Sequence, residues 1–179
     1  MKFFGIICLL LIYNFPLKAE QTPGSMGMEL DALPWLTGGY YVSGWYGVDH
    51  LKYRAVAAQI NVPASFVKNG FKDHEITAYA LILDYFPKNN FKGIWYGAGF
   101  EKWQSSITNK SDNINKEFDH TVFTAGLGYV WHISDVLYLN PWAALHMLIS
   151  GEEKISVGNR TYQQDTIIPS ASIKLGWIF

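Results

Sequence analysis

Sets of histidine, aspartate and serine recur in the chain, and such sets can supply a nucleophile, a base and a group that orients the base. Asp73 and His74 end one polar segment, and Asp119 and His120 end another. The serines between these pairs are Ser105, Ser106 and Ser111. Polar surface segments contain the same residue types for solvation, so we expect solvated loops here and keep a catalytic set as the alternative.

Metal and cofactor chemistry have little support in the sequence. The five histidines show no paired ligand spacing: His50, His74, His120, His132 and His146. The single cysteine, Cys8, excludes disulfides and thiolate metal sites from the rest of the chain. No glycine-rich loop has the spacing of a phosphate site. We therefore predict no metal, no cofactor and no nucleic-acid partner.

The N-terminus has the pattern of a secretory signal peptide. Lys2 precedes an apolar run that ends at Tyr13, and Ala19 offers a small residue for cleavage. We predict a signal peptide over residues 1–19 and one mature domain over residues 20–179. Removing Lys2 and Lys18 leaves 12 Lys and Arg against 15 Asp and Glu, a net charge of −3.

The composition favours a membrane β-barrel over a soluble domain. Charged residues make up 16% of the chain, whereas ordinary soluble proteins contain about 25%. Aromatic residues also reach 16%. The mature segment has no run of 18 apolar residues, the length that a membrane-crossing helix would need.

The last eleven residues show the alternation of a strand in a membrane β-barrel. One row is apolar: Pro169, Ala171, Ile173, Leu175, Trp177 and Phe179. The other row is mostly polar or small: Ser170, Ser172, Lys174, Gly176 and Ile178. The stretch resembles the C-terminal strand of bacterial outer-membrane barrels, where a terminal Phe is recognised by the insertion machinery.

Similar alternation predicts an all-β fold, an eight-stranded antiparallel up-and-down transmembrane β-barrel. The expected strands span residues 26–33, 40–48, 51–62, 75–86, 91–104, 119–133, 137–149 and 169–179. Tight turns after the second, fourth and sixth strands alternate with longer polar loops, including residues 63–74 and 105–118. A hairpin signal around Gly158-Asn159 predicts a ribbon that projects past the membrane.

Eight strands enclose a lumen only wide enough for side chains or a small ligand. We expect a polar network there, with buried charges paired to offset their desolvation. Its members are Glu29, Asp31, Lys52, Arg54, Asp84, Glu101, His146 and Lys174. Because the last strand closes against the first, Lys174 should meet Glu29 or Asp31. The expected membrane-interface aromatics are Tyr85, Tyr129, Trp131, Trp177 and Phe179.

A soluble barrel of lipocalin type, with the apolar rows turned inward, is the rival fold. Its outer surface would then need to be charged. The opposite rows, which would form this outer surface, instead carry Trp95, Trp103, Tyr138 and Trp142 among glycines. These residues suit a lumen better than a wet surface.

Most of the mature chain resembles the uncharacterised small outer-membrane β-barrel proteins of Gram-negative bacteria, with a porin-like fold. The resemblance rests on residues 39–41, 60–63, 91–93, 139–142 and 174–179. It implies an outer-membrane location and contact with membrane lipid and lipopolysaccharide, and it brings no established catalytic residues to carry over.

Barrels of this size also include two enzyme classes that modify the lipid anchor of lipopolysaccharide. His132-Ile133-Ser134 resembles the His-x-Ser pair of one class, and the loop residues named above resemble the set of the other. His132 and Ser134 adjoin a tight turn on the periplasmic side, whereas the enzymes work near the outer leaflet.

Three functions therefore stay open. The first is a structural or surface-interaction role through the extracellular loops, with a surface partner of unknown identity. The second is a conduit for small hydrophobic molecules, suggested by Val56, Ile60, Trp95 and Trp142. The third is a lipid A-modifying enzyme.

Overall fold

The computed structural model describes residues 24–88 and 90–179. The predicted signal peptide, residues 1–19, lies outside the described residues. Within the described part, no helix has the length and apolar character needed to cross a membrane.

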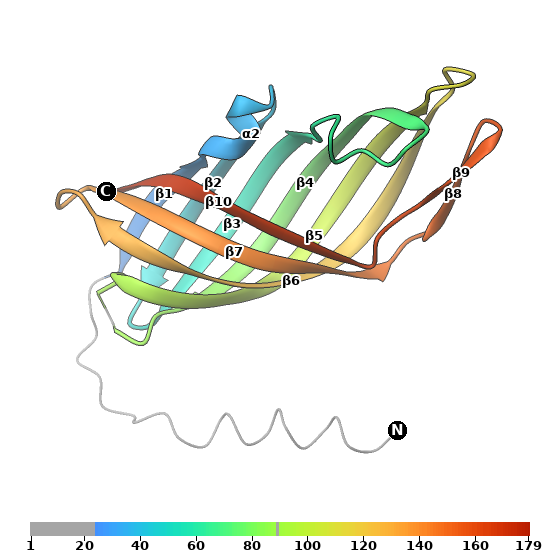
Figure 1. Cartoon of the computed structure of the whole chain (residues 1–179). Helices are drawn as coiled ribbons and strands as arrows, with labels where there is room; N and C mark the ends of the chain where they lie inside the picture. Colours follow the sequence, from blue (N-terminus) through green and yellow to red (C-terminus); the bar gives the residue numbers. More distant parts are fainter. Residues whose placement is uncertain (1–23, 89) are drawn as a thin grey trace, which may run out of the picture.

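Eight antiparallel strands close into a barrel (Figure 1). They are β1 Ser25–Asp31, β2 Tyr40–Val48, β3 Leu51–Asn61, β4 Phe71–Tyr85, β5 Gly93–Asn109, β6 Asn115–His132, β7 Leu137–Ser150 and β10 Ile167–Ile178. Each strand pairs with its neighbour along the barrel, and β1 closes the ring against β10. The sequence prediction of an eight-stranded antiparallel barrel is confirmed.

The two ends of the barrel differ. The connections β2–β3, β4–β5 and β6–β7, together with the C-terminus, lie at one end, which we call the turn end. The opposite end, the loop end, carries the β3–β4 and β5–β6 connections, the helix α2 Ala32–Leu36, and a separate hairpin of β8 Lys154–Val157 and β9 Arg160–Gln163.

The outward rows form an apolar band around the barrel. On β4, Tyr79, Leu81, Leu83 and Tyr85 are all exposed, and similar rows follow on β5, β6, β7 and β10. Towards the loop end the outward residues become polar, as with Glu75 on β4 and Gln104 on β5. The outward alternation is that of a membrane barrel with strands that continue beyond the lipid.

Several predicted loops are strand in the structure. Residues 105–118 were expected to form a loop, yet β5 continues to Asn109 and β6 begins at Asn115, with Ser105 paired to Phe118. Strand β4 likewise begins at Phe71 instead of residue 75. Beyond the apolar band both faces of a strand can be polar, so the alternation that marks a strand disappears.

The first strand is shorter than predicted, because a helix replaces its last two residues. Asp31 ends β1 and caps α2 by accepting a hydrogen bond from the backbone N–H of Leu33 at 3.1 Å. The expected turn over residues 34–39 is therefore partly helical. Helix α2 packs against β2, β3 and β10 (Figure 1).

The predicted ribbon is present as β8–β9, but it packs on the barrel instead of projecting alone. Ile155 and Val157 of β8 are fully buried against Phe71, Ile107 and Tyr162. We call these five residues the cap. The cap is a small hydrophobic core at the loop end, separate from the lumen core.

Candidate functional site

The middle of the lumen is filled by a charged floor, which consists of Glu29, Asp31, Lys52, Arg54, Asp84 and Lys174. All six side chains are buried, and three are acids and three are bases. Their formal charges cancel, as burial in a low-dielectric interior requires. Side chains alternate between the two faces of β1, β3, β4 and β10, and each of the six occupies a position that faces the lumen.

Glu29 is the centre of the floor. Its Oε1 lies 2.8 Å from Lys52 Nζ and accepts hydrogen bonds from Tyr138 Oη at 2.8 Å and Asn140 Nδ2 at 3.1 Å. Its Oε2 lies 3.9 Å from Lys174 Nζ and 4.0 Å from Arg54 Nη1. The predicted approach of Lys174 to Glu29 is thus present in the structure.

Arg54 and Asp84 form the second pair of the floor. The guanidinium donates from Nε at 3.1 Å and from Nη2 at 2.9 Å to the two carboxylate oxygens. This two-point geometry fixes both side chains. On the turn side of the floor, a layer of large side chains fills the lumen: Trp45, Phe86, Phe91, Trp95, Val130 and Tyr138. The floor and this layer together fill the lumen on the turn side with buried side chains.

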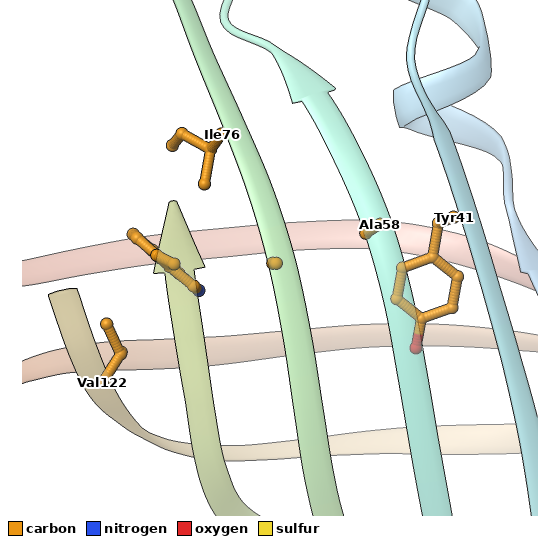
Figure 2. Close-up of a cluster of buried hydrophobic side chains, with 6 residues drawn as sticks. Tyr41, Ala58, Ile76 and Val122 are labelled. Atoms are coloured by element: carbon orange, nitrogen blue, oxygen red, sulfur yellow. The ribbon is translucent and has the colours of Figure 1, made fainter. Parts of the chain in front are cut away.

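On the loop side of the floor the lumen opens into a cavity of about 610 Å³. Its lining is mainly apolar and includes Val56, Ile60, Ala80, Trp142 and Ile168. Figure 2 shows the wall cluster formed by Tyr41, Ala58, Ile76 and Val122, whose side chains extend from the strands into the interior. The lumen is therefore packed at the floor and on its turn side, whereas its loop-end half holds a cavity.

The barrel wall beside the cavity is incomplete as a sheet. Pairing between β1 and β10 ends at Asp31 and Lys174, although β10 continues to Ile167 at the loop end. Helix α2 fills this part of the wall, and both Leu33 and Pro34 line the cavity. Asp31 holds the helix in place, since it also accepts from Trp142 Nε1 at 2.7 Å and Ser172 Oγ at 2.5 Å.

Four polar side chains cross the cavity wall in a line, and we call them the polar row: Glu101, Thr124, His146 and Ser170. They come from β5, β6, β7 and β10, which are adjacent in the barrel. All four line the cavity. Ser170 Oγ lies 2.7 Å from His146 Nε2, and Thr124 Oγ1 lies 2.8 Å from His146 Nδ1 and 2.6 Å from Glu101 Oε1.

At the loop end, His74 joins the cap to the cavity. Its ring packs edge-on against Tyr162 and lies near Phe118, beyond the apolar band. Burial, with smaller contributions from His120 and Lys68, lowers the pKa of His74 to about 4. Burial and Asp165 raise the pKa of Tyr162 to about 12. Both groups are therefore neutral at pH 7.

The loop residues singled out for nucleophile chemistry do not form a hydrogen-bonded set of nucleophile, base and acid: His74 and His120 both pack on Phe118, but their other contacts lie elsewhere. His120 Nε2 contacts the carbonyl oxygen of Glu152 at 2.9 Å, and Asp119 pairs with Lys102 at 2.9 Å. Asp73 is exposed, with Lys72 at 3.9 Å. Ser105 is buried, and Ser111 bonds to Asn109 and Asn159.

His132 and Ser134 do not form a nucleophile–base pair. Ser134 Oγ accepts from the backbone N–H groups of Val136 and Leu137 and closes the turn. The His132 ring instead stacks on Tyr138, with ring centroids 5.7 Å apart. Both residues lie at the turn end, away from the cavity.

The predicted interface aromatics lie on the outer surface at the turn end. Tyr85, Tyr129, Trp131 and Phe179 are exposed, and Trp177 is half-buried. At the other edge of the band, Tyr79 and Phe100 are also exposed. In the described part of the chain, no three His, Cys, Asp or Glu side chains cluster as a metal site would need.

Sequence reasoning placed Glu101 and His146 in the lumen but missed their link to Thr124 and Ser170. The strand register is the feature that would reveal this link. His146 lies directly opposite Thr124 of β6 and opposite Ile168 of β10, the strand that also carries Ser170. One sequence shows which residues face inward, but it does not give the stagger between β7 and β10, because a long connection joins them.

No family model and no curated protein matches the chain. Among solved structures, the crystal structure of Neisserial surface protein A (NspA) superimposes with a TM-score of 0.49 and 7% sequence identity. The superposition covers 88% of this chain and 93% of the NspA chain.

Proposed function

We propose that this chain is an integral outer-membrane β-barrel protein that binds a small apolar molecule in the loop-end half of its lumen. The observation that carries the binding function is the cavity of about 610 Å³, closed by the charged floor and lined mainly by apolar side chains. Sites for small ligands usually measure about 300–1,000 Å³ and combine apolar walls with a few polar groups.

The apolar band supports the membrane part of the proposal. A barrel closed by strand pairing satisfies backbone hydrogen bonds within the protein, as a membrane-spanning sheet requires, and residues such as Leu81 and Tyr129 remain exposed on its outer face. Lipid and lipopolysaccharide would contact this band. The alternating C-terminal strand, which ends on Phe179, would be the segment that the insertion machinery recognises.

The part of the barrel wall that α2 forms supports a route by which a ligand enters the cavity from the lipid layer. A strand ladder cannot part without losing backbone hydrogen bonds, whereas here a five-residue helix separates the cavity from the outside. Leu36 and Trp35 of this helix face outward and are exposed. An apolar molecule dissolved in the outer leaflet could thus reach the cavity between α2 and β10. The charged floor below the cavity supports a binding site over a pore.

Filling the cavity tests the proposed function. Ala80 lies opposite Val56 on the inner wall, so Ala80→Trp should weaken binding of a dansyl-labelled fatty acid by at least about tenfold. The matched control is Ala98→Trp on neighbouring β5, where the side chain is exposed on the outer face. Binding is measured by fluorescence titration of the detergent-folded barrel, and the heat-dependent gel shift shows that each variant is folded.

The control variant should bind like the unaltered protein. Absence of saturable binding to the unaltered barrel, or equal binding by Ala80→Trp, would refute the proposed function.

A further inference from the structure

The polar row has the connectivity of a nucleophile, a base and an acid. Ser170 Oγ is 2.7 Å from His146 Nε2. The other ring nitrogen, Nδ1, is 2.8 Å from Thr124 Oγ1 and 3.3 Å from Glu101 Oε1. A serine whose hydroxyl meets one nitrogen of a histidine, with a carboxylate on the other side, is the arrangement that activates serine for acyl transfer.

The hydroxyl and imidazole protons of the polar row can be assigned by starting from the group that can only accept hydrogen bonds. The Glu101 carboxylate only accepts hydrogen bonds, so Thr124 donates its single hydroxyl proton to Oε1 at 2.6 Å. Thr124 Oγ1 then accepts from His146 Nδ1–H. With its single proton on Nδ1, the ring carries none on Nε2, and the Ser170 hydroxyl donates to that nitrogen. This tautomer is the one that a general base for Ser170 needs.

The carboxylate of the row is held rigidly. Its second oxygen, Oε2, accepts from Trp103 Nε1 at 2.6 Å. The Trp103 ring also packs on His146, with ring centroids 5.3 Å apart. Glu101 and Trp103 thus fix the imidazole from the side opposite Ser170.

We propose that Ser170 is the nucleophile and His146 the general base of an ester hydrolase whose substrate is a carboxylic ester of an alkyl chain held in the cavity. Thr124 and Glu101 are positioning residues that set the tautomer and orientation of His146. This proposal rests on the proposed function, since the apolar cavity supplies the binding of the chain. The same cavity places the ester beside Ser170 and limits the water around it.

The reaction balances without a metal or a redox partner. Ser170 Oγ bonds to the ester carbonyl carbon while its proton moves to His146 Nε2. The tetrahedral adduct then expels the alcohol, which takes that proton, and an acyl group remains on Ser170. Water, deprotonated by His146, attacks this acyl group, and the carboxylic acid leaves as Ser170 regains its proton.

The simpler reading is a hydrogen-bonded row that only satisfies buried polar groups. A fluorophosphonate probe distinguishes the two, because it forms a covalent adduct only with an activated serine. The unaltered, detergent-folded barrel should gain the mass of one probe on the peptide that contains Ser170. Ser170→Ala and His146→Gln should abolish labelling. The matched control is Ser134→Ala at the turn end, where the hydroxyl accepts from backbone N–H groups and does not contact a histidine.

Two substrates identify the source of the ester. A p-nitrophenyl ester of a medium-length fatty acid represents a free ester, and a phospholipid in mixed micelles represents a membrane lipid. Hydrolysis of either substrate that is lost in Ser170→Ala supports the proposal. Glu101→Gln should lower kcat about 10²-fold with little change in KM, because the loss lies in orienting the base. It should also alter the pH profile of kcat, which a purely structural role would not do.

The binding titration separates this proposal from the proposed function. Ser170→Ala should keep the affinity of the unaltered barrel for the dansyl fatty acid. If the folded barrel binds that probe but neither reacts with fluorophosphonate nor hydrolyses an ester, the hydrolase is refuted and the binding function stands. If it does not bind the probe at all, the binding function fails first.

Discussion

The two halves of the lumen share one barrel wall but are built in opposite ways. In the turn-end half, six buried charges and a layer of aromatic side chains fill the interior. In the loop-end half, Ala58, Ala78, Ala80 and Ala144 leave an apolar cavity. The inward positions thus fill the turn-end half completely, whereas in the loop-end half several of them carry alanine and leave space.

Because of this difference, we expect the charged floor to determine the stability of the barrel and the cavity to determine ligand binding. Each charge of the floor depends on the others, so the floor tolerates little change. The cavity wall contains side chains that already border empty space, so a change there disturbs fewer contacts. The predictions below test that separation, beginning with the largest effect.

Glu29→Gln should destabilise the folded barrel most. The substitution keeps the shape of the side chain but leaves Lys52 and Lys174 without their common carboxylate, and the floor gains a net positive charge. Breaking a buried ion pair in this way costs about 3–5 kcal/mol. Urea titration of the barrel in lipid vesicles, followed by tryptophan fluorescence, measures the change in unfolding free energy.

Ile168→Ala in the cavity wall is the comparison for Glu29→Gln. Ile168 is half-buried and borders the cavity, so its truncation should cost less than about 2 kcal/mol. An equal loss for the two variants would contradict the separation between floor and cavity.

The charged half of this contrast was readable from the sequence, because alternation assigns each side chain to a face, whereas the cavity was not predicted. It placed Glu29, Lys52, Arg54 and Lys174 inside, and the closure of a barrel brought the last strand to the first. Strand β2 and the hairpin signal at Gly158-Asn159 were also located correctly.

Other features were not readable from one sequence. Helix α2 depends on a cap by Asp31 and on packing against β10, which are tertiary contacts. The cavity depends on which small residues meet across the lumen. The polar row depends on the register of β7 and β10, and the long connection between them leaves that register open.

Acidification should loosen the cap but not the floor. The pKa of His74 is lowered from 6.5 to about 4 by burial, so folding favours its neutral form. Its contribution is complete above pH 6.5 and declines as the pH falls towards 4, because only the unfolded segment takes up the proton. At pH 5 the cap should be weaker by about 2 kcal/mol.

Hydrogen exchange measures this change locally. Protection of the Ile107 and Ile155 amides, corrected for the intrinsic exchange rate, should fall between pH 7 and pH 5. In His74→Phe the decrease should be much smaller, since no proton is taken up at this site. Unchanged protection in the unaltered protein would show that His74 does not control the cap.

The smallest effect is expected for the ion pair at the loop end. Lys68 Nζ lies 2.6 Å from Asp165 Oδ1, closer than any pair in the floor, but Asp165 is exposed and Lys68 is partly exposed. Water weakens the attraction and leaves little desolvation to offset, so exposed pairs contribute about 0–1 kcal/mol. Asp165→Asn should therefore change the urea midpoint only slightly, and Lys68 keeps its contact with the carbonyl oxygen of Gln163. A loss comparable to that of Glu29→Gln would mean that distance, and not burial, decides the strength of ion pairs in this barrel, and the contrast between its two halves would have to be abandoned.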